Sequence, residues 1–260
     1  MSIINSYHWF SNPTEFNDPF DCQIDLQSDE ISVDEYMELY VLARHGEKPT
    51  ENKFYETRFP VNSIDNGSFT SSFKNQLLEF GKHVKKEVKA TGVLSLSENF
   101  DNTTMWSHYA ENHQGICIEY APDMMNEEED IQKTCFKVDY LPAKDISFNI
   151  YELFAKCSNN HNNKQFQQLM WTLALTKSDD WKYEEEWRLI HNKNGIFRYS
   201  PLAIKGIYFG LKCGVEEKRA IRNILGDKLM SFFQMVKSSE GLSLDRVPMG
   251  KDSIYWSTYP

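Results

Sequence analysis

The sequence predicts an α+β fold with a mixed or antiparallel central sheet. Compact apolar segments of strand length recur from the middle of the 260-residue chain towards its end. Most of these segments follow one another directly or are joined by short helical stretches, a pattern typical of α+β proteins. Two longer amphipathic helical segments precede them and are expected to form an outer layer.

The composition indicates one domain with a substantial core. Hydrophobic residues make up 40% of the chain and aromatic residues 14%, which is ample for a single core. We therefore expect one domain over residues 1–260. Within it, residues 28–92 should form a helical insertion or lid, and residues 93–247 the sheet-containing core with inserted helices.

The first element is a short aromatic strand, SYHWF, at residues 6–10. It is followed by breaks at Asn12-Pro13 and at Asn17-Asp18-Pro19, because proline and Asx residues favour turns. Apolar residues at helical spacing and a terminal glycine predict a helix from Val33 to Gly46. A longer amphipathic helix is expected from Ser71 to Gly92.

The remaining elements are mostly strands joined by short helices. Strands are expected, in order, at residues 92–99, 115–122, 135–142, 182–190, 205–211 and 231–237, with a weaker one at 243–249. Helices are expected at residues 105–113, 146–176 and 216–225, with a solvated helical turn at 124–131 and an exposed loop at 159–164.

Charge and cysteine content limit the class of protein. The formal net charge of −10 argues against a broad electrostatic grip on nucleic-acid backbone. The one obvious basic run, Lys82 to Lys89, is interpreted as a solvated helix face. The five cysteines form no CxxC pair and are odd in number, which indicates free thiols. With no signal-like start and no membrane-length apolar segment, we expect a cytoplasmic protein with no membrane partner.

The most informative stretch is KYEEEWRLI, residues 182–190. If it is a strand, period-two alternation puts Glu184, Glu186 and Arg188 on one face and Trp187 and Leu189 on the other. The apolar face suits a core, and Arg188 could keep a neighbouring carboxylate ionised. The competing interpretation is an exposed strand edge with an ordinary surface ion pair.

Other polar residues add candidates for the same site. Ser95 and Ser97 are two apart on a predicted strand, so they share a face and could bind a sugar hydroxyl or anchor a carboxylate. His108 and Tyr109 lie in the MWSHYA helix. No residues stand at metal-ligand spacing, so no metal is expected. Cys117 is interpreted as a structural thiol, as is the cysteine at position 213.

Four segments resemble one bacterial family, the domain of unknown function family 2971. They read WFSNPTEFNDPFDC, LSLSEN, MWSHYAENHQGICIEY and WKYEEEWRLI, and the resemblance spans Trp9 to Leu211. Members typically share a "MWSHYA…H-GICIEF" block and a late "Y-E-x-E-[WY]-R". They usually also begin with a Tyr-Lys-Tyr strand, which this sequence does not show.

The order of these motifs is also similar, more distantly, to the ADP-ribosyltransferase superfamily. This resemblance implies an ADP-ribosyltransferase-like fold and NAD as cofactor. Such enzymes place His or Arg on a first strand, Ser or Tyr on a middle strand and Glu on a late strand. By that pattern Glu186 would bind the nicotinamide ribose, Glu184 would act as a base, and Ser95 and Ser97 would hold the ribose and orient Glu186.

Arg188, His108 and Tyr109 are the candidates for cofactor binding. The superfamily resemblance implies a macromolecular acceptor, protein or nucleic acid, an inhibitory protein partner, and a role as a toxin or phage-defence effector. A non-catalytic binding module that retains the fold is the alternative, and a hydrolase with His108 as base is a third reading. The surroundings of Glu186 discriminate: a latch needs it packed and fully paired with Arg188, whereas an enzyme needs it in a concave pocket beside Ser95 or Ser97, with space for a dinucleotide.

Overall fold

The computed structural model describes residues 5–22, 26–46, 56–60, 62–121, 135–157, 163–226 and 230–260. The chain forms two compact units from alternating segments. The first unit comprises Met1–Ser11, Gly92–Val138 and Asp180–Pro260, and the second comprises Asn12–Thr91 and Asp139–Asp179. The predicted single domain, with its segments 28–92 and 93–247, stays a prediction.

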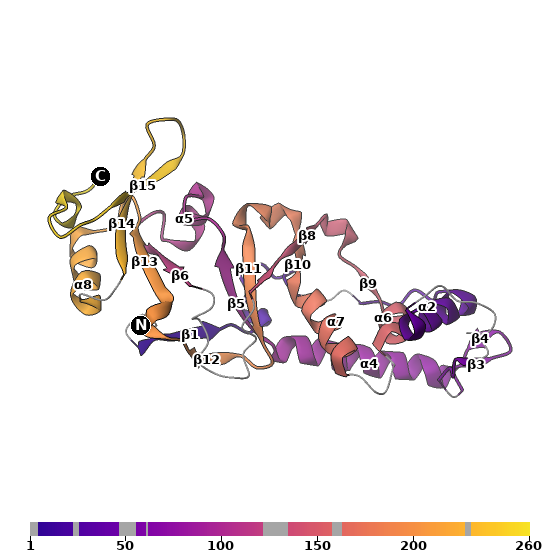
Figure 1. Ribbon diagram of the computed structural model, residues 1–260. Coiled ribbons are helices and arrows are strands. Elements are labelled where there is room, and N and C mark those ends of the chain that lie inside the picture. Colours follow the sequence, from indigo (N-terminus) through magenta and orange to yellow (C-terminus); the bar gives the residue numbers. More distant parts are fainter. Residues whose placement is uncertain are drawn as a thin grey trace. The chain divides into compact units, whose positions relative to one another are not determined.

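The first unit contains a three-stranded antiparallel sheet in the order β5-β11-β7, of which Figure 1 labels β5 and β11. A two-stranded antiparallel ladder, β1-β12, meets β5 through a bridge between Ser11 and Val93. The bounds of these strands are β1 Tyr7–Phe10, β5 Gly92–Ser97, β7 Phe136–Lys137, β11 Glu186–His191 and β12 Gly195–Arg198. The strands predicted at residues 6–10 and 92–99 are therefore confirmed.

A second, four-stranded sheet of the same unit is mixed. Its order is β15-β14-β13-β6, with β13 and β14 parallel and the other pairs antiparallel. The bounds of its strands and of the unit's helices are β6 Ile116–Tyr120, β13 Ile204–Phe209, β14 Ser231–Lys237, β15 Leu244–Pro248, α5 Thr103–Tyr109, α8 Val215–Leu225, η4 Asp179–Glu184, η5 Pro201–Ala203 and η6 Ile254–Trp256. The α+β class with mixed and antiparallel sheets agrees with the prediction.

The core of the first unit joins residues of both sheets. Phe10, Leu189, Ile207 and Phe209 are buried in one apolar cluster, and Leu94 and Leu96 pack against it. Because alternate residues of a strand face opposite sides, the leucines of β5 face this core and Ser95 and Ser97 face away. The apolar pattern of the two strands thus fixes which face carries the polar residues.

The second unit is mainly helical. An aromatic cluster that includes Tyr36, Phe69, Phe73 and Tyr151 forms its core. Its elements are η1 Pro13–Glu15, β2 Leu26–Gln27, α2 Val33–His45, β3 Ile64–Asp65, β4 Ser68–Phe69, α4 Ser71–Ala90, β8 Asp139–Leu141, η3 Ala143–Asp145, β9 Phe148–Asn149, α6 Ile150–Cys157, α7 Asn163–Leu175 and β10 Thr176–Ser178. No helix among the described residues has the length and apolarity needed to cross a membrane.

The helix ends follow ordinary capping chemistry. The Ser32 side chain accepts a hydrogen bond from the Glu35 amide at the start of α2, and Gly46, at φ 70°, ends it as predicted. Helix α4 ends earlier than predicted, at Ala90. Gly92 is the first residue of β5, where a Cβ would lie 2.3 Å from the Lys193 carbonyl oxygen. This glycine therefore permits a close backbone approach and does not cap the helix.

Two predicted strands need correction. Residues 135–142 form two short strands, β7 and β8, in different sheets, and the division between the units falls between them. The strand predicted at 182–190 begins only at Glu186, because Glu185 has a φ of 45° and η4 precedes it. The weaker strand at 243–249 is a full partner of β14. The turn at 124–131 and most of the loop at 159–164 lie outside the described residues.

Candidate functional site

Ser97 lies directly opposite Glu186, and Ser95 opposite Arg188, in the antiparallel pair of β5 and β11. Residues directly opposite in such a pair project to the same face. The strand that carries the two serines and the strand that carries Glu186 are therefore neighbours in the sheet. Both serines are exposed, whereas Glu186 is only 3% exposed and Arg188 is fully buried.

Arg188 and Glu186 form a bidentate ion pair. The arginine Nε donates to Glu186 Oε1 at 2.7 Å, and Nη2 donates to Oε2 at 2.9 Å. This fork is the strongest geometry for an arginine–carboxylate pair and fixes the orientation of the carboxylate. An adjacent guanidinium favours the ionised carboxylate. An ordinary surface pair is excluded, since both side chains are buried.

Glu184 lies in a different secondary-structure element from the one predicted. It is the last residue of η4, so the prediction that it alternates with Glu186 on one strand is wrong. The left-handed backbone of Glu185 interrupts the extended conformation between them. Glu184 is nevertheless only 3% exposed, as buried as Glu186. The turn therefore buries two carboxylates two residues apart without a continuous strand.

The end of β5 and the loop after it donate three hydrogen bonds to backbone carbonyls of this turn. They run from Ser97 Oγ to the Glu184 carbonyl (2.8 Å), from the Glu98 amide to the Glu185 carbonyl (3.1 Å) and from Asn102 Nδ2 to the Tyr183 carbonyl (2.6 Å). Ser97 thus holds the backbone of Glu184, whereas the resemblance implied that it orients the carboxylate of Glu186. A left-handed glutamate persists because its surroundings determine it several times over.

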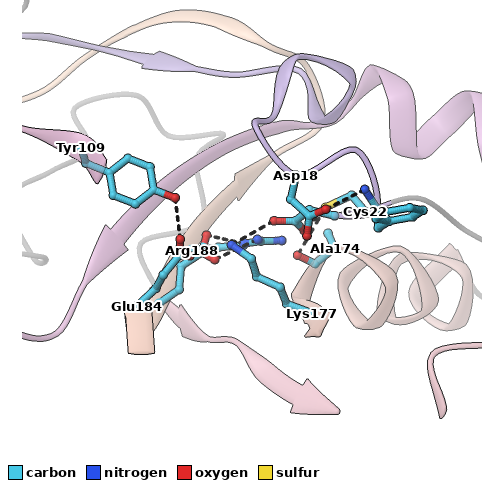
Figure 2. A network of polar contacts seen from close by, with 10 residues as sticks. Asp18, Cys22, Tyr109, Ala174, Lys177, Glu184 and Arg188 are labelled. Atoms are coloured by element: carbon cyan, nitrogen blue, oxygen red, sulfur yellow. Dashed lines mark hydrogen bonds and ion pairs between the residues drawn. The ribbon is translucent and has the colours of Figure 1, made fainter. Parts of the chain in front are cut away.

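Tyr109 brings α5 to the same place. Its hydroxyl donates to Glu184 Oε1 at 2.5 Å, and Figure 2 shows it directed at that carboxylate. The tyrosine is 50% exposed. The neighbouring His108 is exposed, with Nδ1 3.5 Å from the hydroxyl of Tyr183. The structure therefore gathers Ser95, Ser97, Tyr109, Glu184, Glu186 and Arg188 around two strands and one turn, with His108 at the rim; the role predicted for each stays a prediction.

His8 is a buried titratable residue that the sequence interpretation did not select. It lies on β1, stacks on Tyr199 with ring centres 4.2 Å apart, and has no hydrogen-bond partner at Nε2 among the described residues. Burial lowers its pKa to about 4. The sequence feature that could have indicated a buried histidine is its alternation with Phe10 in an aromatic strand. Its strand face is that of Phe10, which packs with Leu189, so it lies on the core side.

The cysteine thiols are all buried or half-buried. All five cysteines are free, as predicted. Burial raises the pKa of Cys117 to about 11, and that of Cys213 also to about 11, so neither is prepared as a thiolate nucleophile. In the described ranges no group of three or more His, Cys, Asp or Glu side chains is arranged to hold a metal ion.

Comparison with known proteins supports part of the predicted resemblance. Residues 105–189 match the family described as a protein of unknown function, DUF2971. The match includes Tyr109, Glu184, Glu186 and Arg188; the resemblance predicted from Trp9 onwards is not tested outside it. No curated protein and no solved structure matches the chain. Similarity to a family without known function leaves the activity to be argued from the site itself.

Proposed function

We propose that this chain is an ADP-ribosyltransferase-like enzyme that uses NAD to modify a macromolecule. The observation that carries the proposal is the cross-strand arrangement of exposed Ser97 and buried Glu186, with Arg188 fixing the carboxylate. It places a serine strand beside a late glutamate strand, as the superfamily pattern requires.

The residues present suit a ribose-containing donor. Ser95 and Ser97 are exposed and carry hydroxyls that can bond to sugar hydroxyls. Bound NAD would supply an ADP-ribosyl group whose carbon–nitrogen bond breaks as an acceptor oxygen bonds to the ribosyl carbon, with nicotinamide taking the electron pair. Glu186 stabilises positive charge that develops on the ribose, and its fixed orientation avoids reorganisation. Glu184 takes the proton of the acceptor.

The acceptor is proposed to be a protein. The net charge of −10 disfavours a nucleic-acid backbone and suits a protein acceptor or an inhibitory protein partner. A role as a toxin or phage-defence effector is part of the same proposal and is based on the superfamily resemblance.

A second function is favoured by one specific observation. Arg188 engages both oxygens of Glu186 in a buried pair, which is the arrangement expected of a structural latch in a non-catalytic binding module. The latch therefore requires only that Glu186 be packed and held by Arg188, whereas the transferase requires this carboxylate to reach the ribose of bound NAD.

Incubation with labelled NAD, with and without host lysate, separates the two functions. Wild-type protein should transfer label to a protein and release nicotinamide. Glu186→Gln should lose roughly two to three decades in rate, the size expected when a transition-state charge stabiliser is removed. Glu216→Gln is the matched control, since Glu216 is an exposed glutamate in α8. Background signal from all three proteins, each shown to be folded, would favour the binding module.

A further inference from the structure

Tyr109 is hydrogen-bonded to a carboxylate that is almost fully buried. Glu184 is 3% exposed and Tyr109 is 50% exposed, and the two meet through a hydroxyl-to-carboxylate hydrogen bond of 2.5 Å (Figure 2). The tyrosine is therefore half-exposed, with its hydroxyl on a carboxylate that is almost fully buried. Side chains exposed to solvent change rotamer rapidly.

One residue sets the position of both partners. Asn102 Oδ1 accepts from the amides of Thr104 and Met105 and so begins α5, the helix that carries Tyr109. The same side chain donates through Nδ2 to the Tyr183 carbonyl, in the turn that ends at Glu184. The meeting of hydroxyl and carboxylate is therefore built into the local structure and does not depend on a chance surface contact.

We infer that Tyr109 is a movable cover that occupies the acceptor subsite, and that the acceptor group is a phenolic hydroxyl of a protein. The inference rests on the proposed function, in which Glu184 takes the acceptor's proton. A carboxylate that already accepts a hydrogen bond from a phenol has the geometry required of a general base towards a phenol. An incoming tyrosine side chain would replace Tyr109 at the same carboxylate oxygen.

Chemical labelling of Glu184 tests the cover without NAD. A water-soluble carbodiimide with an amine nucleophile modifies accessible carboxylates, and peptide mass spectrometry reports the modified residue. Tyr109→Phe removes a hydrogen bond to a charged group, which is worth about 1.5–3 kcal/mol, so labelling of Glu184 should rise by roughly one to two decades. Tyr259→Phe is the matched control, because Tyr259 is an exposed tyrosine outside the site, and it should label like wild type.

The phenol subsite is tested in the variant Tyr109→Ala with p-cresol as the probe. p-Cresol should bind saturably and slow the labelling of Glu184 in Tyr109→Ala, and should not do so in wild type. Unchanged labelling in both Tyr109 variants, or no protection by p-cresol, would overturn the inference and leave the proposed function standing. Protection by p-cresol with no nicotinamide release from NAD by wild type would instead overturn the transferase function, and the acceptor assignment with it.

Discussion

Ser97 and Glu184 are joined by a hydrogen bond of 2.8 Å from the serine hydroxyl to the glutamate carbonyl. Ser97 also lies opposite Glu186 across β5 and β11. Ser97 therefore binds the backbone of Glu184 and also lies opposite Glu186. Through Ser97, the positions of Glu184 and Glu186 depend on the same part of β5.

Loss of the buried guanidinium should be costly. Arg188→Met is expected to lower the free energy of unfolding by about 3–5 kcal/mol, because the buried Glu186 carboxylate loses its bidentate partner. Urea unfolding measures the change. Lys82→Met is the control: it removes an exposed pair with Glu79 and should cost about 1 kcal/mol or less. Similar losses in the two variants would contradict the buried-pair account.

The turn after α5 should favour glycine. Glu111, Asn112 and His113 have φ values of 47°, 53° and 71°, three successive left-handed residues. Glycine adopts this conformation without the steric cost paid by a residue with a Cβ. Glu111→Gly should therefore exceed Glu111→Ala in free energy of unfolding by about 1 kcal/mol, measured by chemical denaturation. Equal stabilities would show that position 111 is not left-handed.

Gly210 should not tolerate a side chain. A Cβ there would lie 2.2 Å from the backbone oxygen of His113, so the backbone would have to shift. Gly210→Ala is expected to cost about 3 kcal/mol, seen as a lower melting temperature. At Gly250 an added Cβ meets nothing within 4 Å, so Gly250→Ala should change stability by about 0.5 kcal/mol or less. A well-tolerated Gly210→Ala would refute this packing.

His8 should make folding stability depend on acidity. Burial lowers its pKa to about 4, against an ordinary value of 6.5, so below pH 6.5 the unfolded chain binds a proton before the folded chain does. The contribution is fully present above pH 6.5 and is lost as pH falls towards 4, by up to about 3 kcal/mol.

The comparison of wild type with His8→Phe isolates this effect. Other groups titrate in the same window, but they are common to both proteins and largely cancel in the difference between their unfolding free energies. The difference should change between pH 6.5 and 4 and stay flat above 7. A difference that is flat across the whole range would contradict the buried, neutral state of His8.

Much of the fold could be predicted because its elements obey local rules. Helix α2 follows from an N-cap serine and a C-terminal glycine, and the strands β5, β6 and β13 follow from compact apolar runs bounded by turn residues. The common face of Ser95 and Ser97 could be predicted because period-two spacing puts alternate residues of a strand on one face. These features depend on residues close together in sequence.

The failures have a common physical cause. The turn at Glu185 requires a left-handed non-glycine residue, which is held by hydrogen bonds from residues 81 to 87 positions earlier, and no local pattern indicates it. The split of residues 135–142 depends on β8 pairing with β10, far along the chain. The contact of Tyr109 with Glu184 likewise joins residues 75 positions apart. Tertiary contacts determine all three features, so the periodicity of the sequence alone could not predict them.

Nicotinamide release from NAD by the purified protein tests the central claim most directly. Wild type and Glu216→Gln should release nicotinamide at the same rate, and Glu186→Gln, assayed at a temperature where it is folded, should do so roughly two to three decades more slowly. Equal release by a folded Glu186→Gln, or no release by wild type, would contradict a catalytic role for the glutamate that faces Ser97.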